Sequence, residues 1–145
     1  MDIWNTLRHF KRTERWGDPD MMNGLLLLLL DEIRNRIDAS IIIHCGFSTT
    51  GHVKKSQHYA GNAADFHIIN SRPFYQQVRH IEEILAELQV DDCVGLGIYP
   101  DGNTPYFHLD VRGSQARWGY LYGAYCSYEL ARQWAERQAY KEEQA

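Results

Sequence analysis

Hydrophobic and polar positions along the chain follow two periods, one typical of helices and one typical of strands. Between residues 18 and 37, apolar side chains recur every three or four positions, which predicts an amphipathic helix with a wide buried face. Asp18 and Pro19 suit the cap and first turn of this helix, so we expect it to begin at residue 18. A second helix is predicted from Pro73 to about residue 88, and a third over residues 127–142.

Four short segments have the composition of strands: residues 41–43, 63–69, 94–99 and 106–112. Because side chains alternate along a strand, Asp65 and His67 should share one face of their segment. His108, Asp110 and Arg112 should likewise share the polar face of theirs. Helices and strands do not alternate as repeated strand–helix–strand units. The sequence therefore predicts an α+β fold with a mostly antiparallel sheet flanked by helices.

The composition of the 145 residues is close to that of an average globular protein, with 44% hydrophobic and 23% charged residues. No repeat or linker divides the chain. We therefore expect a single domain over residues 1–145, with an N-terminal arm at 1–18 and a C-terminal helix within 127–145. The three cysteines show no metal-type pairing, so they are predicted to be reduced thiols that are mostly buried.

Charge and hydropathy exclude several classes of partner. The net charge of −4 argues against a general nucleic-acid binder. The longest apolar run, Leu25 to Leu30, is much shorter than the ~20 residues that a membrane span needs, so no membrane insertion is expected. No signal peptide is recognisable near Met1, and synthesis in the cytoplasm is predicted. The oligomeric state stays open.

Metal-capable side chains are concentrated in two segments, residues 56–65 and 106–110. Asp65 and His108 should project from the polar face of a sheet, and His58 lies in the loop that leads into it. Two imidazoles and one carboxylate form a zinc site of the catalytic type, which leaves a fourth position for water. The alternative is that these are ordinary hydrogen-bonded polar groups, which the spacing alone does not exclude.

The same segments resemble a known family. The pattern Ser-x-His-x-x-Gly-x-Ala-x-Asp at 56–65, followed by Gly-x-Tyr-Pro at 97–100 and Phe-His-Leu-Asp at 107–110, is similar to the zinc D-Ala-D-Ala carboxypeptidase family, which also includes the hedgehog signalling domain. The resemblance covers roughly residues 10–119 and points to the short murein-endopeptidase-like branch of bacteria and phages.

This resemblance implies a hedgehog-like fold and a zinc-dependent peptidase that hydrolyses peptide bonds in peptidoglycan stems or cross-links. One Zn²⁺ per chain would be held by His58, Asp65 and His108. Ser56 matches a serine that contacts substrate in several relatives. A phage or prophage origin is expected, with action on the cell wall after phage-type release.

One departure from the family concerns the general base. Many relatives have an acid three residues before the last ligand, where this chain has Pro105. Asp110 is the best substitute, because residues two apart on a strand share a face. The alternative role for Asp110 is to orient His108, as metal-bound histidines usually require.

A second departure concerns an arginine. Relatives usually carry Ser-Gly-Tyr-Arg where this chain has residues 45–48 as Cys-Gly-Phe-Ser, so the expected oxyanion partner is missing. Arg112 is the preferred replacement, and His52, Lys54 and Lys55 are the alternatives. Each of these is more often a solvated surface charge.

Other rings near the predicted site have two interpretations each. His52 and Tyr99 are predicted to bind substrate, with Tyr99 in a groove that also includes Tyr59 and Tyr106, although packing at the sheet edge is the alternative. His44, His52 and His67 could form a second cluster, or they could be hydrogen-bonded histidines. The aromatic stretch from Trp118 to residue 128 is predicted to pack in the core.

The departures leave three function classes. The first is the zinc peptidase described above. The second is a zinc-containing binding module or phage structural component that recognises cell-wall peptide with weakened catalysis. The third is a small cytosolic metalloenzyme that acts on another peptide or amide.

Overall fold

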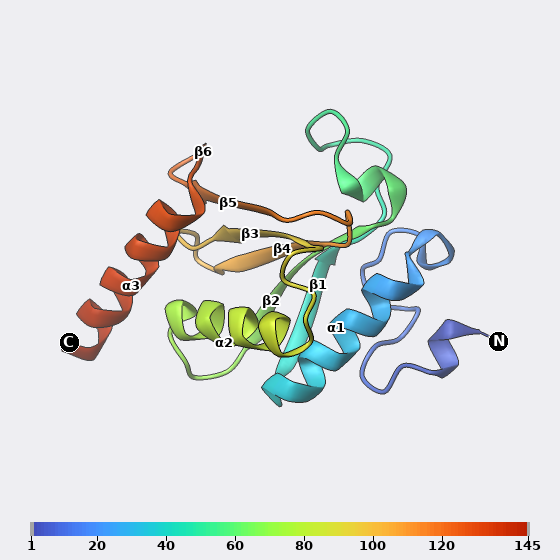
Figure 1. Ribbon diagram of the computed structural model, residues 1–145, viewed down its shortest axis with the longest axis horizontal. Coiled ribbons are helices and arrows are strands. Elements are labelled where there is room, and N and C mark those ends of the chain that lie inside the picture. The colour runs from blue at the N-terminus through green and yellow to red at the C-terminus, as the bar shows by residue number, and fades with distance from the viewer. Residues whose placement is uncertain (1, 145) are drawn as a thin grey trace.

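The computed structural model describes residues 2–144 and contains one mixed sheet with three α-helices in that range (Figure 1). The helices are α1 (Gly24–Ile37), α2 (Phe74–Glu87) and α3 (Tyr128–Gln144), and the short 3₁₀ helices are η1 (Ile3–Asn5), η2 (Pro19–Met21) and η3 (Gln57–Ala60). The strands are β1 (Ser40–Cys45), β2 (Ala63–Ile69), β3 (Gly95–Tyr99), β4 (Tyr106–Asp110), β5 (Ala116–Leu121) and β6 (Ala124–Cys126).

The six strands lie in the order β1-β2-β4-β3-β5-β6. Every neighbouring pair is antiparallel except β3 and β5, which run parallel. The α+β class predicted from the sequence is confirmed, and the sheet is mixed because the chain crosses from β4 to the far side of β3 before β5 begins.

The two faces of the sheet differ in polarity. Alternate residues of β1 to β4 point into the core, among them Phe66, Leu96 and Phe107, which are fully buried. Figure 1 shows α1 and α2 next to one another on one side of the sheet, with α3 at the end formed by β5 and β6. One face is thus covered, and the opposite face keeps the polar residues of β2 and β4.

Helix α1 begins six residues later than the sequence pattern predicts. Asp18 does cap a helix, but its carboxylate accepts the N–H of Asp20 and begins the 3₁₀ helix η2. Asn23 then caps α1 by accepting the N–H groups of Leu25 and Leu26. Two consecutive cap signals lie within the predicted segment, and only the second starts an α-helix.

The hairpin of β5 and β6 was not predicted, and the expectation that its aromatic residues pack in the core is wrong for two of them. Tyr122 is 76% exposed and Tyr125 is 59% exposed. The hairpin lies at the edge of the sheet, where one face remains open to solvent.

The N-terminal arm packs on the core through three buried rings. Trp16 is fully buried and contacts the rings of Trp4 and Phe10 at centroid distances of 5.4 and 5.6 Å. Arg8 and His9 fix the arm to α1, because their backbone N–H groups donate to Asp31.

The three cysteines are free thiols, as predicted, but they are less buried than expected. Cys45 and Cys126 are partly exposed and Cys93 is exposed. In the range 2–144, no helix is both long enough and apolar enough to cross a bilayer.

Candidate metal site

The candidate site is built on one row of residues that crosses the sheet. Asp65 on β2 lies opposite His108 on β4, His108 lies opposite Gly97 on β3, and Gly97 lies opposite Trp118 on β5. Cys45 on β1 extends the row on the other side of Asp65. Strand register alone therefore places a carboxylate, an imidazole and an indole side by side on the open face.

His58 reaches this row from η3. Ser56 caps η3 by accepting the N–H of His58 on its hydroxyl, and Gly61 ends the helix in the left-handed conformation with φ of 72°. The side chain of His58 is 2% exposed, and its Nδ1 lies 2.7 Å from the carbonyl oxygen of Gly46. This contact assigns a proton to Nδ1, so Nε2, which faces Asp65, is the nitrogen that a cation could bind after displacing its proton.

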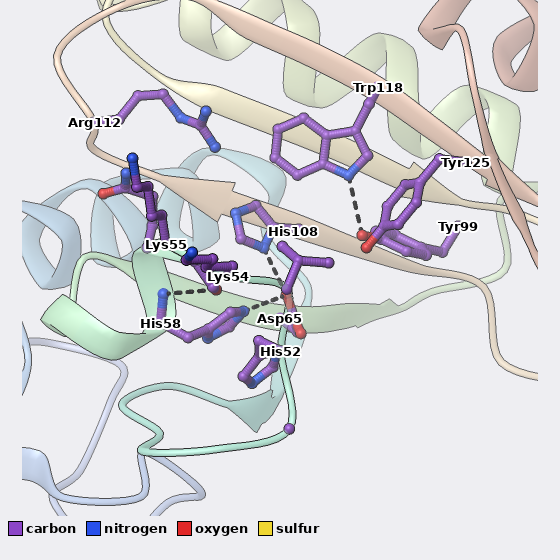
Figure 2. A pocket seen from close by; sticks show the side chains of 14 residues that line it. His52, Lys54, Lys55, His58, Asp65, Tyr99, His108, Arg112, Trp118 and Tyr125 are labelled. Atoms are coloured by element: carbon purple, nitrogen blue, oxygen red, sulfur yellow. Dashed lines mark hydrogen bonds and ion pairs between the residues drawn. The ribbon is translucent and has the colours of Figure 1, made fainter.

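The three predicted ligands meet at the carboxylate of Asp65. His58 Nε2 lies 3.2 Å and His108 Nδ1 lies 3.0 Å from Asp65 Oδ1 (Figure 2). Ligand atoms bound to zinc at 2.0–2.1 Å in a tetrahedron lie about 3.3–3.4 Å apart, so both distances are close to an edge of such a tetrahedron. The donor set and these two distances would suit a metal ion with tetrahedral coordination. The sequence prediction that these three residues come together is met by the geometry.

The charges of the three groups depend on one another. Burial lowers the pKa of His58, but hydrogen bonds to Asp65 and Cys45 outweigh it and raise the pKa to about 10. Burial likewise opposes the charged form of His108, and its contacts with Asp110 and Asp65 raise the pKa. Burial raises the pKa of Asp65, but the two histidines bring it well below its usual range. A cation would therefore displace protons from the imidazoles.

Asp110 lies on the far side of the His108 ring. Its Oδ2 accepts from His108 Nε2 at 2.7 Å, whereas Asp65 contacts the other ring nitrogen. The carboxylate is completely buried, and it also accepts from Gly95 N–H and from the guanidinium of Arg112. These contacts favour the orienting role for Asp110 over the general-base role, because both of its oxygens are occupied and face away from Asp65.

Two glycines of β3 make room for this arrangement. A Cβ on Gly95 would lie 2.5 Å from Asp110 Oδ2, and a Cβ on Gly97 would lie 2.5 Å from the indole of Trp118. The small residues of β3 thus let Asp110 and Trp118 approach the backbone on either side of His108.

A cavity of about 470 Å³ opens above the three ligands. Its walls include most of the residues predicted from the sequence to act in the site: His52, Ser56, His58, Asp65, Tyr99, His108 and Arg112. Asp110 does not line it. Figure 2 shows the cavity framed by Lys54 and Lys55 on one side and by Trp118, Tyr125 and Tyr99 on the other.

Trp118 and Tyr125 line the cavity, although the sequence predicted that they pack in the core. Trp118 donates from its indole nitrogen to the hydroxyl of Tyr99 at 3.0 Å, and its ring lies 4.9 Å from that of His108. Trp118 and Tyr120 alternate with Arg117 and Gly119 as strand residues do, and this alternation was the signal available.

Arg112 is held by Asp110 at the rim of the cavity. Its Nε and one terminal nitrogen lie 2.8 and 2.7 Å from the two carboxylate oxygens of Asp110. The guanidinium carbon Cζ lies 5.3 Å from the centroid of the Trp118 ring. The side chain remains 29% exposed. It thus keeps solvent-facing surface while its charge neutralises Asp110.

A second group of metal-capable atoms is formed by Cys45, His52 and His58. Cys45 Sγ lies 3.6 Å from His52 Nε2 and 3.8 Å from His58 Nδ1. However, the rings of His52 and His58 are stacked, with an interplanar angle of 12° and a centroid distance of 4.1 Å. Imidazole lone pairs lie in the ring plane, so two stacked rings cannot converge on one ion. This group is a weaker metal candidate than the first.

The remaining predicted rings have other contacts. Tyr59 fixes the loop beside the cavity, because its hydroxyl accepts the N–H of His52 and donates to the carbonyl of the same residue. Tyr106 stacks on Tyr99 at 4.5 Å. His44 and His67 contact one another through their ring nitrogens, and burial lowers the pKa of both.

Comparison with known proteins identified no matching family model, no matching curated protein and no matching solved structure. The family resemblance therefore rests on the motif residues themselves.

Proposed function

We propose that this chain is a zinc-dependent peptidase that cleaves peptide bonds in the stems or cross-links of peptidoglycan. The observation that carries the proposal is the meeting of His58, Asp65 and His108, from three separate elements, at the floor of an open cavity. The substrate class comes from the motif resemblance described above.

Zinc would be held by His58 Nε2, Asp65 Oδ1 and His108 Nδ1. When bound, it supplies Lewis-acid chemistry, which lowers the pKa of water to about 7 and polarises a carbonyl group. Hydrogen bonds from His58 to Gly46 and from His108 to Asp110 fix the orientation of both rings. Such outer contacts keep the ligand nitrogens pointed at the same place.

We assign the proton-accepting role to His52. Of the histidine and carboxylate side chains that line the cavity, His58, Asp65 and His108 would serve as ligands, which leaves His52. Burial lowers the pKa of His52 below its ordinary value, so its imidazole is mainly neutral at pH 7 and can accept a proton. In this proposal Asp110 acts only through His108.

Substrate binding is assigned to the walls of the cavity. Lys54, Lys55 and Arg112 bring positive charge to the rim of a chain whose net charge is −4. Stem peptides carry carboxylates, which these side chains can pair with. Tyr99 and Trp118 supply flat apolar surface on the opposite wall.

The proposal is tested first by metal content and digestion. Purified chain should contain about one zinc, and His58→Ala should remove it. Incubation with muropeptides should release cut stems or cross-links, and the matched variant His80→Gln, on α2 and outside the cavity, should leave both results unchanged. Absence of products from zinc-loaded protein would contradict the catalytic proposal.

The role of His52 is tested separately. His52→Gln should keep zinc and reduce the rate of hydrolysis by about 10²–10⁴-fold, the usual contribution of a general base. Asp110→Asn should instead reduce the affinity for zinc. A variant of His52 that cleaves at the wild-type rate would remove it from the mechanism.

A zinc-containing binding module is the second candidate. It is favoured by Pro105, which stands where relatives have an acid, and by the absence of any carboxylate other than that of Asp65 among the described residues that line the cavity. Zinc bound at one equivalent together with retention on insoluble peptidoglycan, but without released products, would support this candidate over the peptidase.

A further inference from the structure

The open face of the sheet carries a second pair of metal-capable groups outside the cavity. His44 Nε2 and His67 Nδ1 face one another at 2.5 Å, and the two rings are tilted by 47° at a centroid distance of 4.8 Å. Neither residue lines the cavity above Asp65. Two nitrogens at this separation require a proton or a cation between them, because two lone pairs would repel.

The backbone fixes this pair in place. The register of β1 and β2 pairs Ile43 with Phe66 and Cys45 with Asp65, so His44 is the extra residue of a β-bulge. Ile43 and Phe66 are buried on the covered face of the sheet. Alternation after buried Ile43 puts His44 on the open face, where His67 and Asp65 also lie, and the bulge brings Cys45 to the same face.

We propose that His44 and His67 form a separate two-imidazole chelate for a divalent transition-metal ion, with water in the remaining positions. Imidazole nitrogens suit Zn²⁺, Ni²⁺ and Cu²⁺ and do not suit Mg²⁺ or Ca²⁺. Nitrogens bound to zinc lie about 3.3–3.4 Å apart, so the rings need to separate by about 1 Å to admit the ion. Both side chains are only partly buried, which leaves room for that movement.

The position of Asp65 connects the two sites by charge. It lies two residues before His67 on the same face of β2, and its negative charge acts on His44. A cation between His44 and His67 would therefore sit beside the carboxylate that the first site uses. We expect occupation of the second site to weaken zinc binding at the first. The chelate itself does not depend on the proposed function.

The experiment is a zinc titration of chelator-treated protein in competition with a chromophoric chelator. Wild type should show two classes of site. His67→Gln and His44→Gln should each lose the weaker class, His58→Ala should lose the tighter class and keep the weaker one, and His80→Gln should behave as wild type. Thermal melting of each variant checks that it is folded.

The outcomes separate this inference from the proposed function. A titration of His67→Gln that matches wild type would overturn the second site and leave the first intact. Loss of both classes in His58→Ala would also overturn it, because the two histidines would then bind no ion on their own. Loss of the tighter class alone in His58→Ala, with the weaker class absent only from the His44 and His67 variants, supports two separate sites.

Discussion

Asp31 and Asp110 are the two buried acids of the described chain, and they have different roles. Each carboxylate accepts from a guanidinium and from backbone N–H groups: Asp31 from Arg8 and His9, and Asp110 from Arg112 and Gly95. Burial opposes ionisation of both, and in both the arginine and its neighbours lower the pKa. The residue environments are thus chemically alike.

The difference is the third partner. Asp110 also accepts from His108, whose other nitrogen faces Asp65. Asp31, on α1, has its partners in the N-terminal arm and contacts no candidate ligand. A buried acid in one place fixes an arm to a helix, and in the other it fixes a ligand. Burial and a lowered pKa therefore do not by themselves identify a functional carboxylate.

The largest expected effect is a pH dependence of zinc affinity at the candidate metal site, with no matching change at Asp31. Because the pKa of His58 is raised to about 10 without a cation, zinc must displace at least one proton, and affinity should rise about tenfold per pH unit. Between pH 6 and 8 this amounts to about a hundredfold. Asp31 stays ionised over that range, so its contribution to stability should not change. Chelator competition at three pH values measures the slope, and an affinity independent of pH would contradict it.

Asp110→Asn should have the next largest effect. An amide keeps only one of the two acceptor oxygens, so its N–H group must face either His108 Nε2 or the donors at the other position, Arg112 Nε and Gly95 N–H, and His108 is held less firmly. We expect affinity for zinc to fall about 10–100-fold, as for other outer-sphere partners of metal-bound histidines. Asp31→Asn is the matched control, since it removes a buried carboxylate of the same kind without touching a ligand. Equal losses in both variants would show that the effect is global.

Asp31→Asn should instead reduce stability. The amide loses the ion pair with Arg8 and weakens two backbone hydrogen bonds, at a cost of about 2 kcal/mol in the free energy of unfolding, given that Arg8 is half exposed. The folded pKa of Asp31 lies below its unfolded value, so this contribution is present above about pH 4 and disappears as pH falls through the folded pKa. Urea unfolding at neutral and acidic pH should show the difference from wild type shrinking on the acid side.

The contrast between these two acids also shows what sequence reasoning could reach. Period-two alternation placed Asp65 and His108 on one face, and the two strands that carry them are found where they were expected. The same alternation placed Asp110 on the strand of His108 and suggested that Asp110 is the general base. It could not show which nitrogen of His108 the Asp110 carboxylate contacts. That depends on strand register and on the space above Gly95, neither of which a local pattern contains.

Loops and edges account for the other differences. His52 stacks on His58 only because Tyr59 fixes the intervening loop, and such a loop conformation has no periodic signal. Trp118 lies on an edge hairpin, where one side of the strand is open, so its apolar character suggested core packing although it lines a cavity. The motif residues and several wall residues were predictable, and the aromatic wall of Trp118 and Tyr125 was not.

The smallest expected effect distinguishes the two arginines. Arg112→Lys keeps the charge but replaces two directed hydrogen bonds to Asp110 by a single ammonium contact, so His108 is held less firmly. Affinity for zinc should fall by less than about tenfold, which is a smaller loss than in Asp110→Asn. Arg8→Lys is the matched change at Asp31, and because Arg8 is 47% exposed it should cost little stability and leave zinc binding unchanged. If Arg112→Lys leaves affinity at the wild-type value while Asp110→Asn lowers it, the orientation of His108 comes from Asp110 alone, and the arginine serves only to neutralise a buried charge.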